Sequence, residues 1–215
     1  MHLSFVQAVI LGIVQGVTEF LPVSSSGHLV IFSYILGWGS GSLFFDTMLH
    51  FGTGIALLVY FWKDLLLILK EPKKLKIILA GVLPSGLVGF LLSDWFENTF
   101  RLVGYVVLFL LLGSLLMLTA EFYFHKFLTK PTKKEDLTFF SLDSQANNFL
   151  TVPRAFLLGL FQILALFPGF SRSGATISGG LFLGLSRKDS ARFSFWLSLP
   201  VILGAGMLQL VKLLS

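Results

Sequence analysis

A polar, glycine-containing stretch lies inside apolar sequence from Leu166 to Thr176 (LFPGFSRSGAT). Its permanent charge, Arg172, would be costly to bury in hydrocarbon, so it indicates a cavity, a charged partner or an anionic ligand. Gly169 and Gly174 allow the backbone to bend and to approach a ligand closely, and the neighbouring hydroxyl groups add hydrogen-bond donors. The stretch therefore predicts an anion-binding site formed by Ser171, Arg172, Ser173, Gly174 and Thr176.

A related stretch occurs 147 positions earlier, and it indicates an internal repeat. When residues 8–37 are set over residues 155–184, polar residues and glycines coincide: Gly12 with Gly159, Gln15 with Gln162, Ser24 with Ser171, Ser26 with Ser173 and Gly27 with Gly174. Such matches at fixed spacing do not arise from apolar composition alone. The differences between the two copies include three positions at which Glu19, Ser25 and His28 of the first match Leu166, Arg172 and Ala175 of the second. The first copy therefore carries the carboxylate and the imidazole, and the second carries the arginine.

The composition is that of an integral membrane protein. Hydrophobic residues make up 55% of the chain, charged residues 13%, and the mean hydropathy is +0.86, which predicts a single membrane domain over residues 1–215. The net charge of +5 is interpreted as a topology signal, and no basic run interleaved with aromatics predicts a nucleic-acid partner. The absence of cysteine excludes disulfides and thiolate metal sites. The N-terminus lacks the features of a cleaved signal peptide.

Apolar segments and their interruptions predict an all-α polytopic fold. Leu3–Leu21 is apolar but is ended by a proline, serines and a glycine, and the short apolar run Leu29–Leu36 follows. Two short helices around a polar loop predict a re-entrant helix-loop-helix hairpin, and the same pattern recurs at residues 155–184. About four transmembrane helices are expected in addition, at Phe45–Trp62, Ile77–Leu92, Leu102–Phe124 and Phe193–Leu214.

The distribution of lysine and arginine predicts how these spans are oriented. The connection Lys63–Lys76 and the one after Phe124 are rich in lysine, whereas Ser93–Arg101 is not, so the first two are expected in the cytoplasm. The two hairpins then enter from opposite sides, which predicts an inverted-topology repeat with its site near the membrane midplane. Repeat 1 covers about residues 1–124, a cytoplasmic linker about 125–150, and repeat 2 about 151–215 without its last helix pair.

The residues expected at the meeting point suit phosphoryl chemistry. Gln15 and Glu19 are spaced i, i+4 and share one helical face, so their oxygens predict a site for a divalent cation, Mg²⁺ or Ca²⁺. Hydroxyl groups and an imidazole follow, which can bind phosphate and transfer protons, at Ser24, Ser25, Ser26 and His28. Arg172 would hold a phosphoryl group opposite the cation.

Several alternatives stand beside these assignments. Glu19 could be a protonated structural residue, and Ser24 or Ser26 could only cap a helix. His2, His50 and His125 are interpreted as structural or solvated, and Asp46 as interfacial. The nucleophile remains open among Ser25, His28 and a metal-bound water, with Ser25 favoured and His28 assisting. A transporter or flippase of a lipid phosphate would use the same arginine and glutamate without hydrolysis.

Two stretches carry a family resemblance. Gln15–His28 (QGVTEFLPVSSSGH) and Leu166–Thr176 closely resemble the two signatures of the bacterial undecaprenyl-diphosphate phosphatase family, the bacitracin-resistance proteins. The resemblance implies hydrolysis of undecaprenyl diphosphate to the monophosphate, which recycles the lipid carrier of peptidoglycan synthesis at the outer face of the cytoplasmic membrane, with a divalent cation. A homodimer is left open. Members of the family continue with a further pair of apolar helices after the position of Ser215.

The resemblance also implies roles for individual residues. Gln15 and Glu19 match the family's glutamate-or-glutamine-xxx-glutamate element. The other residues that it places in the site are Ser25, His28, Ser171, Arg172, Ser173 and Thr176.

Overall fold

The chain is helical throughout the part that the structure, a computed structural model, describes: residues 3–38, 43–128 and 150–214. No β-strand occurs within these ranges. The α-helices in chain order are α1 (Phe5–Thr18), α2 (Ser25–Ile35), α3 (Leu43–Tyr60), α4 (Trp62–Lys70), α5 (Pro72–Phe100), α6 (Val103–Tyr123), α7 (Val152–Ile163), α8 (Arg172–Phe182) and α9 (Arg187–Leu214). A π-helical turn, Phe124–Leu128, extends α6, and a 3₁₀ turn, Leu164–Leu166, extends α7.

Length and apolarity of the helices confirm an all-α polytopic membrane protein. Three described segments are long and apolar enough to cross a membrane: Pro72–Leu92 in α5, Val103–Leu128 starting with α6, and Arg187–Val211 in α9. The helices α3 and α4 pass the same test only as a pair, and they are bent by 74° at their junction. The described chain thus has three such spans, or four if the bent pair counts as one span, close to the number expected from the sequence.

Two stretches that the sequence analysis treats as connections are helical instead. Most of Lys63–Lys76 belongs to α4 and the first turn of α5, with Glu71 between the two helices. Asp64 in the first turn and Lys70 in the last turn of α4 complement the helix dipole, and Pro72 is suited to the first position of α5. The stretch Ser93–Arg101 is mostly the last two turns of α5. The polar part of the predicted linker, residues 129–149, lies outside the described residues.

The local structure of the two sequence copies is the same. The helix α2 begins at Ser25 and α8 at Arg172, 147 positions later, and both are 11 residues long. In each case the preceding serine accepts a hydrogen bond from the third residue's backbone N–H, as in Ser24 with Gly27 and Ser171 with Gly174. Each helix is followed by a glycine with positive φ. The predicted hairpins are therefore present as helix-turn-helix units, while their re-entrant placement and inverted orientation stay predictions.

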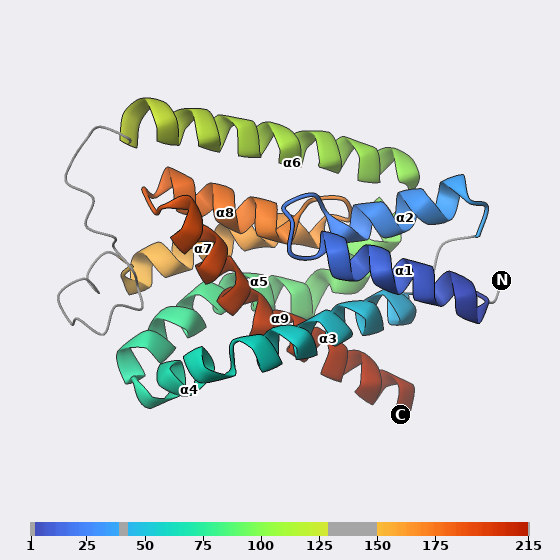
Figure 1. The fold of residues 1–215 in the computed structure, drawn as a ribbon, viewed down its shortest axis with the longest axis horizontal. Helices are drawn as coiled ribbons and strands as arrows, with labels where there is room; N and C mark the ends of the chain where they lie inside the picture. The colour runs from blue at the N-terminus through green and yellow to red at the C-terminus, as the bar shows by residue number, and fades with distance from the viewer. Residues whose placement is uncertain (1–2, 39–42, 129–149, 215) are drawn as a thin grey trace.

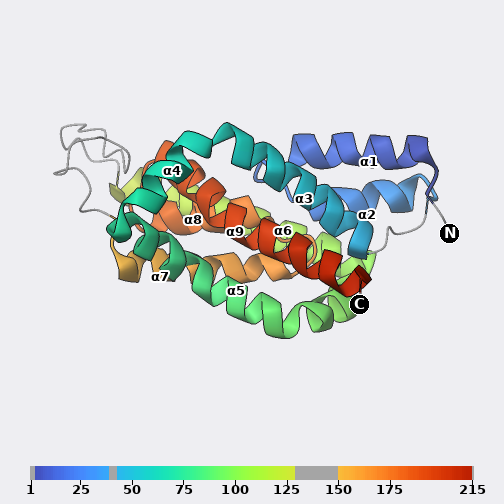
Figure 2. The ribbon, with the colours of Figure 1, turned by 90° about the horizontal axis from the view of Figure 1, so that it is seen from below.

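The two units meet in the interior of the molecule. The helix α8 packs against α6, α7 and α9, and most of its side chains are buried, whereas α6 lies along one side of the molecule (Figure 1) and exposes many leucines, as a lipid-facing helix does. The second view shows α9 running between α3 and α5 (Figure 2), and α9 packs against both of these helices and against α8. The turn between α1 and α2 contacts the start of α8, because Ser173 Oγ donates to the Leu21 carbonyl oxygen at 3.1 Å.

Glycines allow the second unit to pack closely against α5 and α6. A Cβ atom at Gly159 in α7 would lie 2.3 Å from the carbonyl oxygen of Gly81 in α5, so these backbones are in direct contact. In the α7–α8 turn, Gly169 has φ +99° and a Cβ atom there would lie 2.4 Å from the carbonyl oxygen of Val106 in α6. Both contacts require glycine. They hold α7 against α5 and the α7–α8 turn against α6.

Candidate active site

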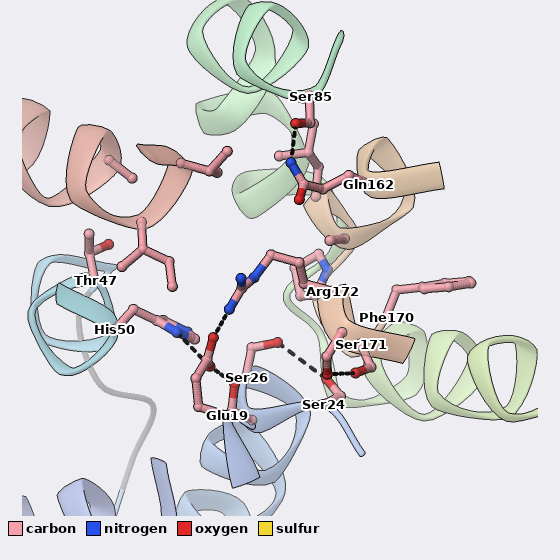
Figure 3. A pocket seen from close by; sticks show the side chains of 18 residues that line it. Glu19, Ser24, Ser26, Thr47, His50, Ser85, Gln162, Phe170, Ser171 and Arg172 are labelled. Atoms are coloured by element: carbon pink, nitrogen blue, oxygen red, sulfur yellow. Dashed lines mark hydrogen bonds and ion pairs between the residues drawn. The ribbon is translucent and has the colours of Figure 1, made fainter. Parts of the chain in front are cut away.

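A cavity of about 220 Å³ lies where the two helix-turn-helix units meet. Figure 3 shows side chains from both turns and from α3 and α5 directed toward it. Its lining residues are Glu19, Ser24, Ser25, Ser26, Thr47, His50, Ser85, Gln162, Ala165, Leu166, Pro168, Phe170, Ser171, Arg172, Ser173, Val201, Ile202 and Ala205. The cavity therefore combines both sequence copies with polar groups that lie outside either motif.

Glu19 is the most highly connected side chain of the site. It lies just after α1, and its side chain is 3% exposed. Arg172, from the start of α8, forms an ion pair with Oε1 (Figure 3). Ser25 Oγ donates to Oε2 at 2.5 Å, and Gln15 Nε2 donates to the same oxygen at 2.8 Å. A buried carboxylate needs such compensation, because the cost of removing it from water is several kcal/mol.

The contact between Glu19 and Arg172 joins the two copies of the repeat. The residues are 153 positions apart in the chain, and each comes from the part of its copy that differs in the other. Because Arg172 is only 16% exposed, its guanidinium is largely removed from water, as expected for an arginine that binds an anion within a membrane protein. The predicted meeting of a carboxylate and an arginine at one site is present in this structure.

All four predicted phosphate-binding serines line the cavity, and they also form local hydrogen bonds. Ser24 and Ser171 cap α2 and α8, and Ser24 adopts φ +65°, which is rare for a residue with a side chain. Ser26 Oγ lies 3.4 Å from Ser24 Oγ, and Ser171 Oγ lies 3.2 Å from Ser173 Oγ. Hydroxyl groups thus surround the N-termini of two helices, where backbone N–H groups favour negative charge.

Two of the predicted phosphate-binding residues and one predicted catalytic residue are directed elsewhere. Thr176 is buried against α9, where its hydroxyl lies 2.5 Å from Ser194 Oγ. The backbone N–H of Gly174 is used by the Ser171 cap. His28 donates from Nδ1 to the Ser24 carbonyl oxygen at 2.8 Å, and its ring stacks on Phe32. None of the three is among the described residues that line the cavity.

A histidine other than His28 lines the cavity. The sequence analysis missed it and interpreted it as structural or solvated. His50 of α3 has its Nδ1 atom 2.9 Å from Glu19 Oε2 and 2.7 Å from Gln15 Nε2. Its side chain is 27% exposed, and Thr47, one turn before it, also lines the cavity. Two polar residues on one face of an apolar helix are a signal that could have identified this position, because membrane helices rarely carry them without a function.

The region around Glu19 also bears on the predicted cation. No group of three or more histidine, cysteine, aspartate or glutamate side chains that could hold a metal occurs among the described residues. The Oε1 atom of Gln15 is buried without a hydrogen-bond partner, although Gln15 is not among the residues that line the cavity. This atom and the Glu19 carboxylate, which also accepts from Ser25 and Arg172, are the oxygen ligands that the predicted pair offers. This donor set fits Mg²⁺ or Ca²⁺ only together with ligand oxygens, as is usual where Mg²⁺ binds through few carboxylates plus substrate phosphates.

Asp46, predicted to be interfacial, lies one turn before His50 in α3. It forms an ion pair with Arg101, the residue that follows α5. The contact joins the start of α3 to the end of α5 and places two more charges near the imidazole.

Comparison with known proteins identifies related sequences over nearly the whole chain. The family described as "Bacitracin resistance protein BacA" matches residues 8–215. Proteins named undecaprenyl-diphosphatase are 39% identical in Chloroherpeton thalassium, covering 98% of this chain and 76% of the relative, and 42% identical in Thermodesulfovibrio yellowstonii, covering 96% and 74%. The one from Caldicellulosiruptor bescii is 42% identical, covering 96% and 75%. The chain thus spans about three-quarters of the length of these relatives.

Proposed function

Because the chain belongs to the bacitracin resistance protein BacA family, we propose that it is a membrane phosphatase that hydrolyses undecaprenyl diphosphate to undecaprenyl phosphate and inorganic phosphate. Relatives about 40% identical to it carry the name undecaprenyl-diphosphatase. The observation that carries the proposal is the contact of Glu19 with both Arg172 and Ser25 at the wall of one cavity. A nucleophile (Ser25), a base (Glu19) and a guanidinium that can bind phosphate (Arg172) are therefore close to one another.

Ser25 is the nucleophile in this proposal, and Glu19 is its base. Ser25 Oγ already donates to Glu19 Oε2 at 2.5 Å, so the carboxylate can accept the hydroxyl proton as Oγ attacks the terminal phosphorus atom. The new bond is Oγ–P, and the bond that breaks joins this phosphorus to the bridging oxygen, which leaves with the lipid monophosphate. Water then hydrolyses the phosphoserine and releases inorganic phosphate. The proton assistance expected from His28 passes to Glu19, because the His28 Nδ1 atom is engaged by Ser24.

His50 extends the proton path. In the tautomer with Nδ1 unprotonated, this atom accepts from Gln15 Nε2 and lies 2.9 Å from Glu19 Oε2. A proton taken by Glu19 can therefore pass to Nδ1 when Nδ1 gives up the hydrogen bond from Gln15. An imidazole suits this role because it exchanges protons readily near neutral pH. His50 would thus return Glu19 to its charged form before the water attacks.

Arg172 binds the phosphoryl group that is transferred. The ion pair with Glu19 uses one η nitrogen, and a guanidinium carries five N–H donors in a planar fork that matches phosphate oxygens. Ser24, Ser26 and Ser171 line the same cavity and would add hydroxyl donors. Fixed donors in a site of this kind stabilise the charge that develops in the transition state.

A divalent cation is part of the proposal. Gln15 Oε1 and the Glu19 carboxylate would hold Mg²⁺ or Ca²⁺ jointly with the diphosphate, since Gln15 Oε1 is otherwise unpartnered. The ion would neutralise charge on the diphosphate. We further propose that the protein lies in the cytoplasmic membrane with the cavity open to the outer face, where it recycles the lipid carrier of cell-wall synthesis. The polyprenyl diphosphate is thus its substrate and membrane lipid its surroundings.

The lipid-phosphate transporter gains no support from the relatives, which are named as diphosphatases. The direct test is release of inorganic phosphate from a long-chain polyprenyl diphosphate by the purified full chain in detergent, with and without EDTA. Wild-type protein should release phosphate, and EDTA should suppress the release. Glu19→Gln keeps the shape of the side chain but removes its charge, so its rate should fall by about a hundredfold or more. Wild-type protein that binds the lipid without releasing phosphate would contradict the proposal.

Acid quench of the enzyme with substrate labelled in the terminal phosphate tests the nucleophile. An acid-stable phosphoserine that is absent in Ser25→Ala is the expected result. An acid-labile adduct would indicate a histidine nucleophile instead, and substantial turnover by Ser25→Ala would exclude the serine mechanism.

A further inference from the structure

A second polar cluster lines the cavity and is not used in the reaction described above. Gln162 of α7 is 1% exposed, and its Nε2 atom donates to Ser85 Oγ at 2.5 Å. Ser85 of α5 is 2% exposed and donates in turn to the Val82 carbonyl oxygen at 3.2 Å. The Gln162 Oε1 atom is buried without a hydrogen-bond partner. A buried amide oxygen left in this way costs free energy unless a ligand or water completes its bonding.

The Gln162–Ser85 cluster lies on the opposite side of Arg172 from Glu19. Figure 3 shows the Arg172 side chain between Gln162 and Ser85 on one side and Glu19 on the other. Close packing maintains the arrangement, since a Cβ atom at Gly159 would lie 2.9 Å from the ring of Pro84, next to Ser85. The cavity thus has two polar ends with a guanidinium between them.

The two ends differ in charge because the two sequence copies differ. Gln15 and Gln162 occupy matching positions, and Gln15 contacts the Glu19 carboxylate and His50. The residue that matches Glu19 in the second copy is Leu166. The Glu19 end therefore has the base and the nucleophile, whereas the Gln162 end presents neutral amide and hydroxyl groups, which can bind an anion without repelling it.

We propose that Gln162 and Ser85 form a second phosphate subsite, which binds the phosphate attached to the lipid while the terminal phosphate lies at Ser25 and Glu19. The inference rests on the proposed function, since only a diphosphate needs two adjoining subsites. It gives the lipid-linked phosphate, the leaving group of the reaction, hydrogen-bond donors of its own. Arg172, which lies between the two ends, is placed to contact both phosphates.

The hydrogen bonding of Gln162 suits this role after a half-turn of its amide. With the amide reversed, Ser85 Oγ donates to Gln162 Oε1 in place of the Val82 carbonyl oxygen, and the NH₂ group takes the place of the unpartnered oxygen in the cavity wall. The Gln162 Oε1 atom and the Gln162 NH₂ group both have hydrogen-bond partners once a phosphate oxygen accepts from the NH₂ group. When the bridging bond breaks, negative charge develops on the lipid phosphate. The Gln162 NH₂ group, held in place by Ser85, stabilises this charge.

The apolar lining of the cavity agrees with a substrate whose lipid chain extends from the Gln162 end. Ala165 and Leu166 follow Gln162 in the chain and line the cavity. Leu166 Cδ2 lies 3.4 Å from the Cβ position of Gly89, one turn beyond Ser85 in α5. An apolar wall therefore continues from the Gln162 end, where the lipid-linked phosphate is placed.

Product inhibition separates the two subsites. For wild type, Gln162→Leu and Ser85→Ala, we would measure kcat/KM for the polyprenyl diphosphate and inhibition by polyprenyl monophosphate and by inorganic phosphate. Gln162→Leu should lower kcat/KM and weaken inhibition by the lipid monophosphate by about tenfold each, as expected for loss of a hydrogen bond to a charged group. Inhibition by inorganic phosphate should change less than about twofold. Ser85→Ala should show the same pattern with a smaller effect.

The matched control is Ser198→Ala in α9. Ser198 is as buried as Ser85 and likewise donates to a carbonyl oxygen of its own helix, that of Phe195, but it does not line the cavity. It should leave both inhibition constants unchanged. Equal weakening of both inhibitors by Gln162→Leu, weakening of inorganic phosphate alone, or no weakening would overturn the subsite. If Gln162→Leu fails to fold, Ser85→Ala decides by the same criteria.

If the protein is not a phosphatase, the result differs from the one expected when only the second subsite is wrong. Wild-type protein would then release no phosphate, and calorimetric titration of wild type and Ser85→Ala with the lipid monophosphate and with inorganic phosphate would test the subsite without turnover. Weaker binding of the lipid monophosphate alone would support it, and equal changes for both ligands would overturn it.

Discussion

At the scale of single residues, the site depends on how the Glu19 carboxylate is shared. Arg172 takes one oxygen, and Ser25, Gln15 and His50 lie around the other. A carboxylate held by several donors keeps a fixed orientation, which an effective base requires. Each of these neighbours should therefore affect catalysis through Glu19, even where it does not contact the substrate.

His50 provides the first test at this scale. His50→Ala removes the contact with Glu19, so we expect kcat to fall by about tenfold or more, with KM changed much less, because the proton path is lost while phosphate binding by Arg172 remains. His50→Gln keeps a polar group at the position but cannot relay a proton, and it should recover stability without recovering kcat. Steady-state phosphate release and thermal unfolding would be measured together.

His125→Gln is the control for this pair, because His125 lies in the π-helical turn after α6 and does not line the cavity. Its kinetic constants should equal those of wild type. A His50→Gln variant with normal kcat would remove His50 from the proton path.

At the scale of elements, the α7–α8 turn positions the arginine. Phe167 packs among the aromatic rings of α5 and α6, with ring centroids 4.8 Å from Phe96 and 4.7 Å from Phe109. Gly169 follows, in the left-handed region at φ +99° and against the backbone of Val106. The turn therefore has little freedom to move, and α8 starts at a defined place.

Gly169→Ala should disturb this turn. The added Cβ atom would lie 2.4 Å from the Val106 carbonyl oxygen, and the backbone conformation is strained for alanine. A cost of about 1–3 kcal/mol corresponds to a fall in Tm on the order of 5 °C, and displacement of Arg172 should reduce phosphate release as well. Thermal unfolding in detergent and the rate of phosphate release measure the two effects.

Gly104→Ala in α6 is the matched control, because nothing lies within 4 Å of the Cβ position there. It should leave both Tm and activity nearly unchanged. Equal effects of the two substitutions would show that the close contact at Gly169 is not what positions the turn.

At the scale of the whole molecule, the predicted opposite orientation of the two repeats implies which segments are accessible from outside. Lys73 and Asn98 lie in the first and last turns of α5, a helix of 29 residues, which is about 43 Å long and so exceeds the thickness of a bilayer core. Its two ends should therefore emerge on opposite sides of the membrane. By the positive-inside rule, the lysines near Lys73 predict that this end lies in the cytoplasm.

Labelling of single cysteines tests this orientation without interference, because the chain contains no cysteine. In intact cells, an impermeant thiol reagent should label a cysteine at Asn98 and should not label one at Lys73 or at Thr132, which lies outside the described residues. Permeabilised cells should label all three and serve as the control. Labelling of Lys73 and Asn98 alike in intact cells would contradict the predicted topology.

The sequence by itself determined the class of fold, and it predicted the repeat and much of the candidate site. Apolar composition requires helices in a membrane because every backbone polar group must be bonded within the segment. The turns of the two copies, together with the capping serines Ser24 and Ser171, are local features set by neighbouring residues. The isolated charges Glu19 and Arg172 could be singled out because an ionisable residue in apolar sequence is rarely without function.

Tertiary structure decided which side chains enter the cavity. His28 and His50 are both histidines near polar residues, but the backbone of Ser24 engages one while the packing of α3 places the other beside Glu19. Ser85 has no sequence signal, because its role depends on the contact of α5 with α7 across glycines far apart in the chain. Local sequence determines a helix and its caps, whereas the direction of a side chain into a shared cavity depends on how distant helices pack against one another.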